Sequence, residues 1–157
     1  MTTPAEKRPP TILVVDDEPD ILESLSDLFA AGVPDLQVKT AISGAQGLEV
    51  LGSGPVDLIL SDYKMPGMNG LQFLEEARRI APQVPRIMMT AFPDLEIAIR
   101  AINEARITTF FTKPLDPQKT IDGVKAALDA RRSQAQRDQA FSRVIDQLRR
   151  KDAGGQA

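Results

Sequence analysis

The chain has 157 residues, of which 42% are hydrophobic and 26% charged, and its formal net charge is −3. These values predict one globular domain with an ordinary core and some residues left over for tails. The absence of Cys and His excludes disulfides, thiolate or imidazole metal sites, a Ser-His-Asp triad and a phosphohistidine. No apolar run approaches the roughly 18 to 20 residues of a membrane span and no secretory signal is visible, so we expect a cytoplasmic protein.

The small net charge conceals an asymmetry between the two ends of the chain. Residues 1–130 carry 12 basic and 19 acidic side chains, whereas residues 131–157 carry 7 basic and 3 acidic ones. The first part therefore has a net charge of −7 and the second of +4. An acidic main domain argues against direct binding of nucleic acid, which requires a basic surface.

Five short apolar segments are predicted to be β-strands. In chain order they span residues 12–15, 36–42, 56–60, 87–89 and 109–111. All but the alternating segment 36–42 are nearly continuously apolar, as parallel strands covered on both faces are. Apolar residues at spacings of three and four predict helices between and after the strands. These residues are Ile21, Leu22, Leu25, Leu28 and Phe29; Leu71, Leu74, Ala77 and Ile80; Leu95, Ala98, Ile99 and Ile102; Ile121, Val124 and Leu128.

Helix start signals support the same order of elements. They are Ser43 with Gln46 and Asn69 with Gln72, which match capping boxes, and Asp116 before Pro117. Strict alternation of strands and helices with short connections predicts right-handed βαβ units in a doubly wound parallel sheet. The functional site of such a sheet lies at the carboxyl ends of its strands.

Polar residues stand at those predicted strand ends. Asp16 and Asp17 follow the first strand, Asp62 ends the third, Thr90 the fourth and Lys113 the fifth. Three carboxylates at close range repel one another, and a hard divalent cation, here Mg²⁺, removes the conflict. A cation, the Lys113 ammonium and the Thr90 hydroxyl would address the oxygens of an incoming phosphoryl group. Asp62, on the central strand, is the best placed nucleophile.

Each of these residues alone has an ordinary structural explanation. An Asp pair after a strand is often a turn or a helix start, Thr90 can be a cap, and a lysine at a strand end is usually solvated. Their coincidence at strand ends, in the right order and with compatible chemistry, favours the functional interpretation.

The set resembles the signature of response-regulator receiver domains with a chemotaxis-receiver-like fold, over roughly residues 11–130. The motifs that carry the resemblance are Val14-Val15-Asp16-Asp17-Glu18-Pro19, Asp62 with Met65-Pro66-Gly67-Met68-Asn69-Gly70, Met89-Thr90-Ala91, and Thr112-Lys113-Pro114. The resemblance implies that Asp62 takes a phosphoryl group from the histidine of a sensor kinase or phosphotransfer protein. It also implies a Mg²⁺ site of Asp16, Asp17, Asp62 and the backbone carbonyl of Lys64. Thr90 and Lys113 would sense and bind the phosphate.

The resemblance also concerns the response to phosphate. It implies a cis peptide between Lys113 and Pro114 and a switch aromatic at Phe110, although Phe110 is equally well explained as a core aromatic. Phosphate would draw Thr90 inward, and the surface of the fourth helix, fifth strand and fifth helix would carry the signal to a downstream protein or output domain. Lys64 and Phe92 flank the site and are expected to tune hydrolysis.

The predicted fold class is α/β: a doubly wound, five-stranded parallel sheet of flavodoxin-like order 2-1-3-4-5, with helices on both faces and a C-terminal helical extension. We expect a disordered arm at 1–10, the receiver domain at 11–130 and a polar, basic helix or linker at 131–157. That extension is either a solvated tail or, through Phe141, Val144, Ile145 and Leu148, an element for dimerisation or partner docking. No output or DNA-binding domain is expected within the chain.

Other functional classes fit less well. A phosphatase or phosphotransferase of the haloacid-dehalogenase kind needs an Asp-x-Asp-x-Thr stretch after the first strand, where this chain has Asp16-Asp17-Glu18-Pro19-Asp20. A flavin phosphate would be repelled by those acidic residues. A scaffold that no longer takes phosphate stays as an alternative. We therefore predict a signalling switch that catalyses only its own phosphoryl transfer and dephosphorylation, rather than an enzyme.

Overall fold

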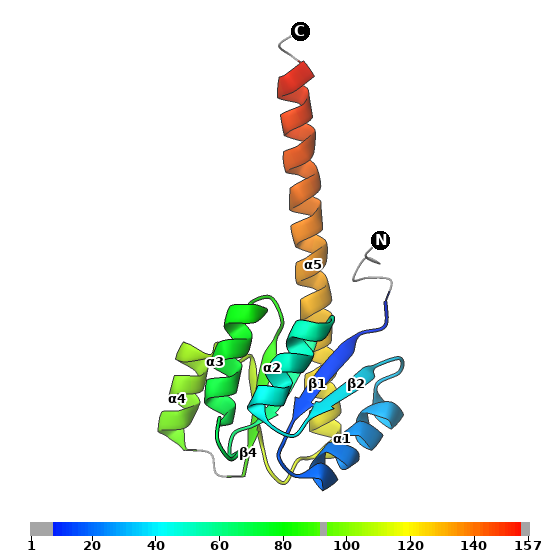
Figure 1. The fold of residues 1–157 in the computed structure, drawn as a ribbon. Helices are drawn as coiled ribbons and strands as arrows, with labels where there is room; N and C mark the ends of the chain where they lie inside the picture. The colour runs from blue at the N-terminus through cyan, green and yellow to red at the C-terminus, as the bar shows by residue number, and fades with distance from the viewer. Residues whose placement is uncertain (1–7, 92–93, 155–157) are drawn as a thin grey trace.

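Five parallel strands form a single sheet in the computed structural model, which describes residues 8–91 and 94–154 (Figure 1). The strands are β1 (Thr11–Val15), β2 (Gln37–Ala41), β3 (Leu58–Asp62), β4 (Arg86–Thr90) and β5 (Thr109–Thr112). The helices are α1 (Pro19–Gly32), α2 (Gly44–Ser53), α3 (Gly70–Ile80), α4 (Leu95–Glu104) and α5 (Pro117–Gly154). The strand order is β2-β1-β3-β4-β5, with every pair parallel, which confirms the predicted fold class.

The sheet is covered on both faces because successive residues of its inner strands point to opposite sides. On β1, Leu13 and Val15 join a core cluster with α2 and α3, whereas Ile12 and Val14 join a second cluster with α1 and α5. Phe73 and Phe29 are the largest buried side chains of the two clusters. The central strands β1 and β3 are therefore buried along their whole length.

The predicted caps are largely observed. Asn69 and Gln72 form a complete capping box at the start of α3, with hydrogen bonds of 2.9 and 3.0 Å. The Ser43 hydroxyl accepts from the Gln46 amide, but the Gln46 side chain accepts from the amide of Ile42 rather than that of Ser43. The side chain therefore reaches one residue further back than in a capping box.

Helix α4 departs from the usual pattern of an amphipathic helix. The spacing of Leu95, Ile99 and Ile102 correctly predicts a helix, but these side chains are 76%, 48% and 55% exposed. The buried residue of α4 is Ala101. The apolar stripe therefore faces solvent, and the small Ala101 provides the contact with the domain.

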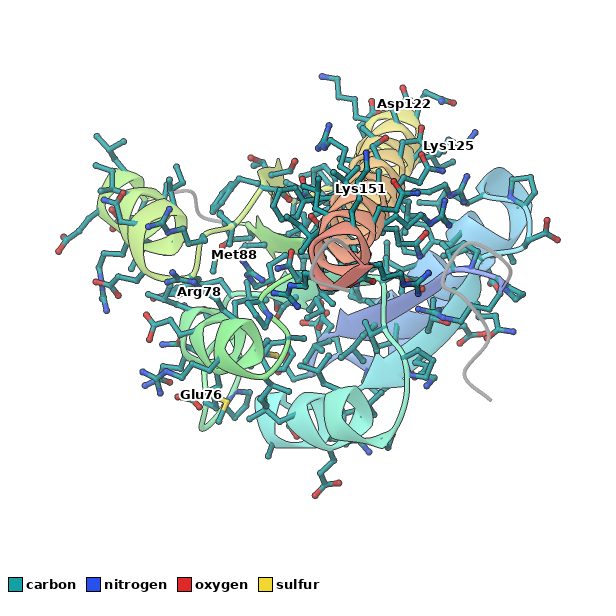
Figure 2. All side chains as sticks on the ribbon, turned by 90° about the horizontal axis from the view of Figure 1, so that it is seen from above. Glu76, Arg78, Met88, Asp122, Lys125 and Lys151 are labelled. Atoms are coloured by element: carbon teal, nitrogen blue, oxygen red, sulfur yellow. The ribbon has the colours of Figure 1, made fainter. Side chains whose placement is uncertain are left out.

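Helix α5 is one continuous helix of 38 residues, about 57 Å long at the usual rise per residue. Its first part packs on the sheet through Val124 and Leu128, and its second part projects beyond the domain (Figure 1). Viewed along α5, Asp122 and Lys125 point away from the sheet (Figure 2). No helix within the described residues is long and apolar enough to span a membrane.

The first described residues lie against the sheet. Arg8 pairs with Asp57, and the carbonyl of Pro10 accepts from the amide of Gln37 at 2.8 Å. Residues 1–7 of the predicted arm lie outside the described residues.

Candidate functional site

Three carboxylates meet at the carboxyl edge of the sheet. Asp16 and Asp17 follow β1 and Asp62 ends the neighbouring β3, and one oxygen from each lies within 4.8 Å of the others. Asp16 is fully buried and Asp62 is 7% exposed, because the strands that carry them are central in the sheet. The topology thus places the three residues as the sequence predicts.

Lys113 brings a positive charge to the same place from the loop after β5. Its Nζ donates to Asp16 Oδ2 at 3.0 Å and lies 3.3 Å from Asp62 Oδ1. The backbone fixes this position, since the amide of Lys113 donates to the carbonyl of Thr90 at 2.8 Å. The peptide between Lys113 and Pro114 is cis, which confirms that prediction.

Backbone amides orient two of the carboxylates. The amide of Glu18 donates to Asp16 Oδ1 at 2.9 Å, and the amide of Tyr63 donates to Asp62 Oδ1 at 3.0 Å. At Asp62 this hydrogen bond favours the ionised carboxylate. The role of the Tyr63 amide was missed in the sequence, where a backbone donor leaves no signal.

Two glycines shape the loop after Asp62. A Cβ at Gly70 would overlap the backbone carbonyl oxygen of Asp62, and the Gly70 amide donates to the carbonyl of Tyr63 at 2.7 Å. Gly67 has a φ of 74°, a left-handed conformation that glycine adopts without strain. The Met-Pro-Gly-Met-Asn-Gly stretch is therefore both a turn and the support of the Asp62 backbone.

Two other predicted site residues, Thr90 and Lys64, lie at the end of β4 and on the loop after β3. Thr90 ends β4, is 3% exposed and pairs in register with Thr112, while Asp62 pairs with Met89. Lys64 is exposed on the loop after Asp62.

Of the two aromatic residues in the prediction, Phe110 and Phe92, the structure describes Phe110. Phe110 is half-buried on β5 and packs against the core cluster of α2, α3 and α4. Phe92 lies outside the described residues.

Burial and repulsion act together on Asp62. Desolvation, and then the charge of Asp16, raise its pKa above the ordinary value of 3.8, and Lys113 only partly opposes this. Burial acts to lower the pKa of Lys113, but its hydrogen bonds and attraction to Asp16 and Asp62 outweigh burial and raise it. Lys113 therefore stays protonated, and its positive charge does not fully offset burial and repulsion at Asp62.

The donor set suits a small, hard divalent cation. It consists of oxygens from three negatively charged carboxylates. Three ligands leave coordination positions of the cation open for water or phosphate. These properties favour a cation that prefers oxygen ligands over metals that prefer nitrogen or sulfur ligands.

Comparisons with known proteins identify relatives of the chain. A family model described as the response regulator receiver domain matches residues 12–125. The hydrogenase transcriptional regulatory protein HoxA of Cupriavidus necator is 36% identical over 120 residues, which are 76% of this chain and 24% of that protein. The transcriptional regulatory protein GlrR of Escherichia coli is 36% identical over 123 residues, 78% of this chain and 27% of that protein. The chain thus spans about a quarter of the length of these regulators.

A shorter relative and a solved structure are covered by the chain over almost their whole length. Sporulation initiation phosphotransferase F of Bacillus subtilis is 34% identical over 117 residues, 74% of this chain and 92% of that protein. The crystal structure of the signal receiver domain of an HD domain-containing protein from Pseudomonas fluorescens Pf-5 has a TM-score of 0.77 and 33% identity. The match covers 80% of this chain and 99% of that one.

Proposed function

The chain belongs to the family of response regulator receiver domains, and on that premise we propose that Asp62 is its phosphoacceptor in a Mg²⁺-dependent reaction. Receiver domains are the signalling switches of two-component systems. The observation that carries the proposal is the cluster of Asp16, Asp17 and Asp62 around the Lys113 ammonium at the carboxyl edge of the sheet. Asp62 is the member of that cluster on the central strand β3, with one oxygen already held by the Tyr63 amide.

The proposed reaction is an in-line transfer from a phosphohistidine of a sensor kinase or a phosphotransfer protein. A carboxylate oxygen of Asp62 attacks phosphorus, the O–P bond forms, the N–P bond breaks, and the electron pair stays on the leaving imidazole nitrogen. Lys113 would pair with the phosphoryl oxygens, and the Thr90 hydroxyl would donate to them. Mg²⁺ held by Asp16, Asp17, Asp62 and the Lys64 carbonyl would neutralise the charge of the carboxylates and of the phosphoryl group.

The proposed output is a change in protein contacts at the surface of α4, β5 and α5. The exposed stripe of Leu95, Ile99 and Ile102 supports this, because a contiguous exposed apolar patch is a mark of an interaction site. Movement of Thr90 toward the phosphate would release Phe110 on the adjacent strand and so reshape that surface. The target would be a downstream protein or an output domain, as in the regulators that the chain resembles.

The test is the intact mass of the protein after incubation with Mg²⁺ and acetyl phosphate. The wild type should gain one phosphoryl group, and chelation of the metal should abolish the gain. Asp62→Asn should gain none, whereas Asp57→Asn, at the other end of β3, should still be modified. Absence of any gain in the wild type would refute the proposal and favour the scaffold alternative.

A further inference from the structure

A groove runs beside the candidate site between α1 and the loop that follows β5. Its volume is about 550 Å³, within the usual range of binding pockets. Its lining is largely apolar, from Ile21, Leu25 and Leu28 of α1 and from Pro114, Leu115 and Pro117. The α1 residues form a ridge at relative positions 0, 4 and 7, the arrangement of one helix face.

The helix that forms one wall of this groove, α1, is strongly acidic. Asp20, Glu23 and Asp27 are exposed on α1. Between Thr11 and Gln37 the sequence has seven acidic residues and no Lys or Arg. The groove is therefore suited to an apolar helix that carries positive charges beside its apolar ridge.

The second half of α5 is such a helix. Phe141, Val144 and Leu148 are 69%, 52% and 55% exposed, and they lie at relative positions 0, 3 and 7. Residues 131–151 contain seven Arg and Lys against two Asp. Each ridge extends over seven positions from its first to its last residue, a rise of about 10 Å, so the two ridges match in length and are opposite in charge.

The groove of the same molecule is out of reach of this ridge. Pro117, the first residue of α5, lines the groove, and Phe141 is 24 positions further along the same unbroken helix. At 1.5 Å per residue this places Phe141 about 36 Å away from Pro117. This part of α5 projects beyond the domain and away from the sheet (Figure 1).

We propose that the basic, apolar face of α5 (Phe141, Val144, Leu148 and the surrounding Arg and Lys) docks into the α1 groove of a second copy of this chain. Reciprocal docking closes a dimer, and one-way docking extends a chain of copies. The consequence for regulation rests on the proposed function. Because Lys113 lines the groove, a docked α5 covers one side of the site and competes with a protein phosphodonor, while a small donor still enters.

Sedimentation velocity of the full chain tests this docking without any phosphodonor, from about 1 to about 200 µM, where weak contacts are populated. The wild type should associate, and salt should weaken the association. The triple variant Arg149→Glu, Arg150→Glu, Lys151→Glu reverses the charge of α5, and Glu23→Lys with Asp27→Lys reverses the charge of α1. Each should weaken association about tenfold or more, and an equimolar mixture of the two variants should restore it.

The control is Glu49→Lys with Glu76→Lys, which changes the net charge as the α1 reversal does but lies on α2 and α3, away from the groove. This variant should associate like the wild type. A monomer at every concentration would overturn the proposal and leave the groove to a different protein. Association that survives the α1 reversal would also overturn it, because the α5 helices would then pair with each other. Neither result bears on phosphorylation of Asp62, which is measured separately by mass.

Discussion

Strand β3 has one aspartate directly before it and another as its last residue, and the two differ in their partners. Asp57, directly before the strand, receives two hydrogen bonds from the Arg8 guanidinium at 2.6 and 2.8 Å and one from the Thr11 amide at 2.8 Å. Asp62, its last residue, shares the Lys113 ammonium with Asp16. Both aspartates are 7% exposed, so the contrast lies in their partners rather than in their burial.

The same contrast extends along both edges of the sheet. At the amino edge Arg86 is 5% exposed and donates to the backbone carbonyls of Ala105 and Val84, at 2.8 and 2.7 Å, and more weakly to those of Pro82 and Arg106. At the carboxyl edge three carboxylates crowd one another. At the amino edge Asp57 is paired with Arg8 and Arg86 is hydrogen-bonded to backbone carbonyls. At the carboxyl edge Asp16 and Asp62 share one ammonium, and in the proposed function a cation and a phosphoryl group would complete that site.

Removal of Arg86 should have the largest effect on stability. Arg86→Met keeps much of the side-chain volume but leaves the buried carbonyls of Ala105 and Val84 without their donor, so we expect a loss of about 3 kcal/mol in the free energy of unfolding. Urea denaturation measures this. Arg79→Met, at an exposed arginine on α3, is the control and should change stability by less than about 0.5 kcal/mol. Equal effects of the two substitutions would show that the amino edge does not depend on the hydrogen bonds of Arg86.

Asp57→Asn should come next, with a loss of about 2 kcal/mol. The amide cannot accept both guanidinium hydrogen bonds as a carboxylate does, and it leaves the half-buried Arg8 charge without its counterion. Thermal unfolding with and without about 1 M NaCl measures the effect, because the wild-type pair should be weakened by salt while the variant should respond less. A stability equal to that of the wild type would mean that the Arg8 pair contributes nothing.

The fold and the carboxyl edge were predictable for a common reason. In a parallel sheet the apolar run identifies the strand and the next residues identify its carboxyl end, so local sequence places Asp16, Asp62 and Lys113 on one edge. The residues of the amino edge have no such signal. Arg8 and Asp57 are 49 positions apart, and their pairing depends on the parallel registers of β1 with β2 and β3.

Two further features show the limit of periodicity as a guide. The spacing of Leu95, Ile99 and Ile102 predicts a helix without saying whether its apolar face is buried, and in α4 that face is exposed. The tail at 131–157 was predicted as a helix or a linker, and the structure has residues 131–154 in the unbroken α5. Burial depends on what the rest of the chain places opposite a face, which a local pattern does not contain.

Asp62→Asn should have the smallest effect and the opposite sign. Burial and the charge of Asp16 raise the pKa of Asp62, so the ionised carboxylate costs stability in the folded protein. Without divalent metal at pH 7, we expect the variant to be more stable by about 1 kcal/mol, or roughly 2–4 °C in Tm. Its advantage should be absent below the ordinary pKa of 3.8, where Asp62 is protonated in both states. The advantage should grow as the pH rises through the raised pKa, because a group with a raised pKa loses its stabilising contribution there.

Addition of Mg²⁺ then tests whether Asp62 belongs to a cation site or is an ordinary buried aspartate. The metal should raise the Tm of the wild type and of Asp57→Asn alike, since both keep the Asp16, Asp17 and Asp62 carboxylates. It should raise the Tm of Asp62→Asn much less, and so reverse the order of stability of that variant and the wild type. If Asp62→Asn instead destabilised the metal-free protein as Asp57→Asn does, the two ends of β3 would be alike, and the carboxyl edge would hold no charge in need of a partner.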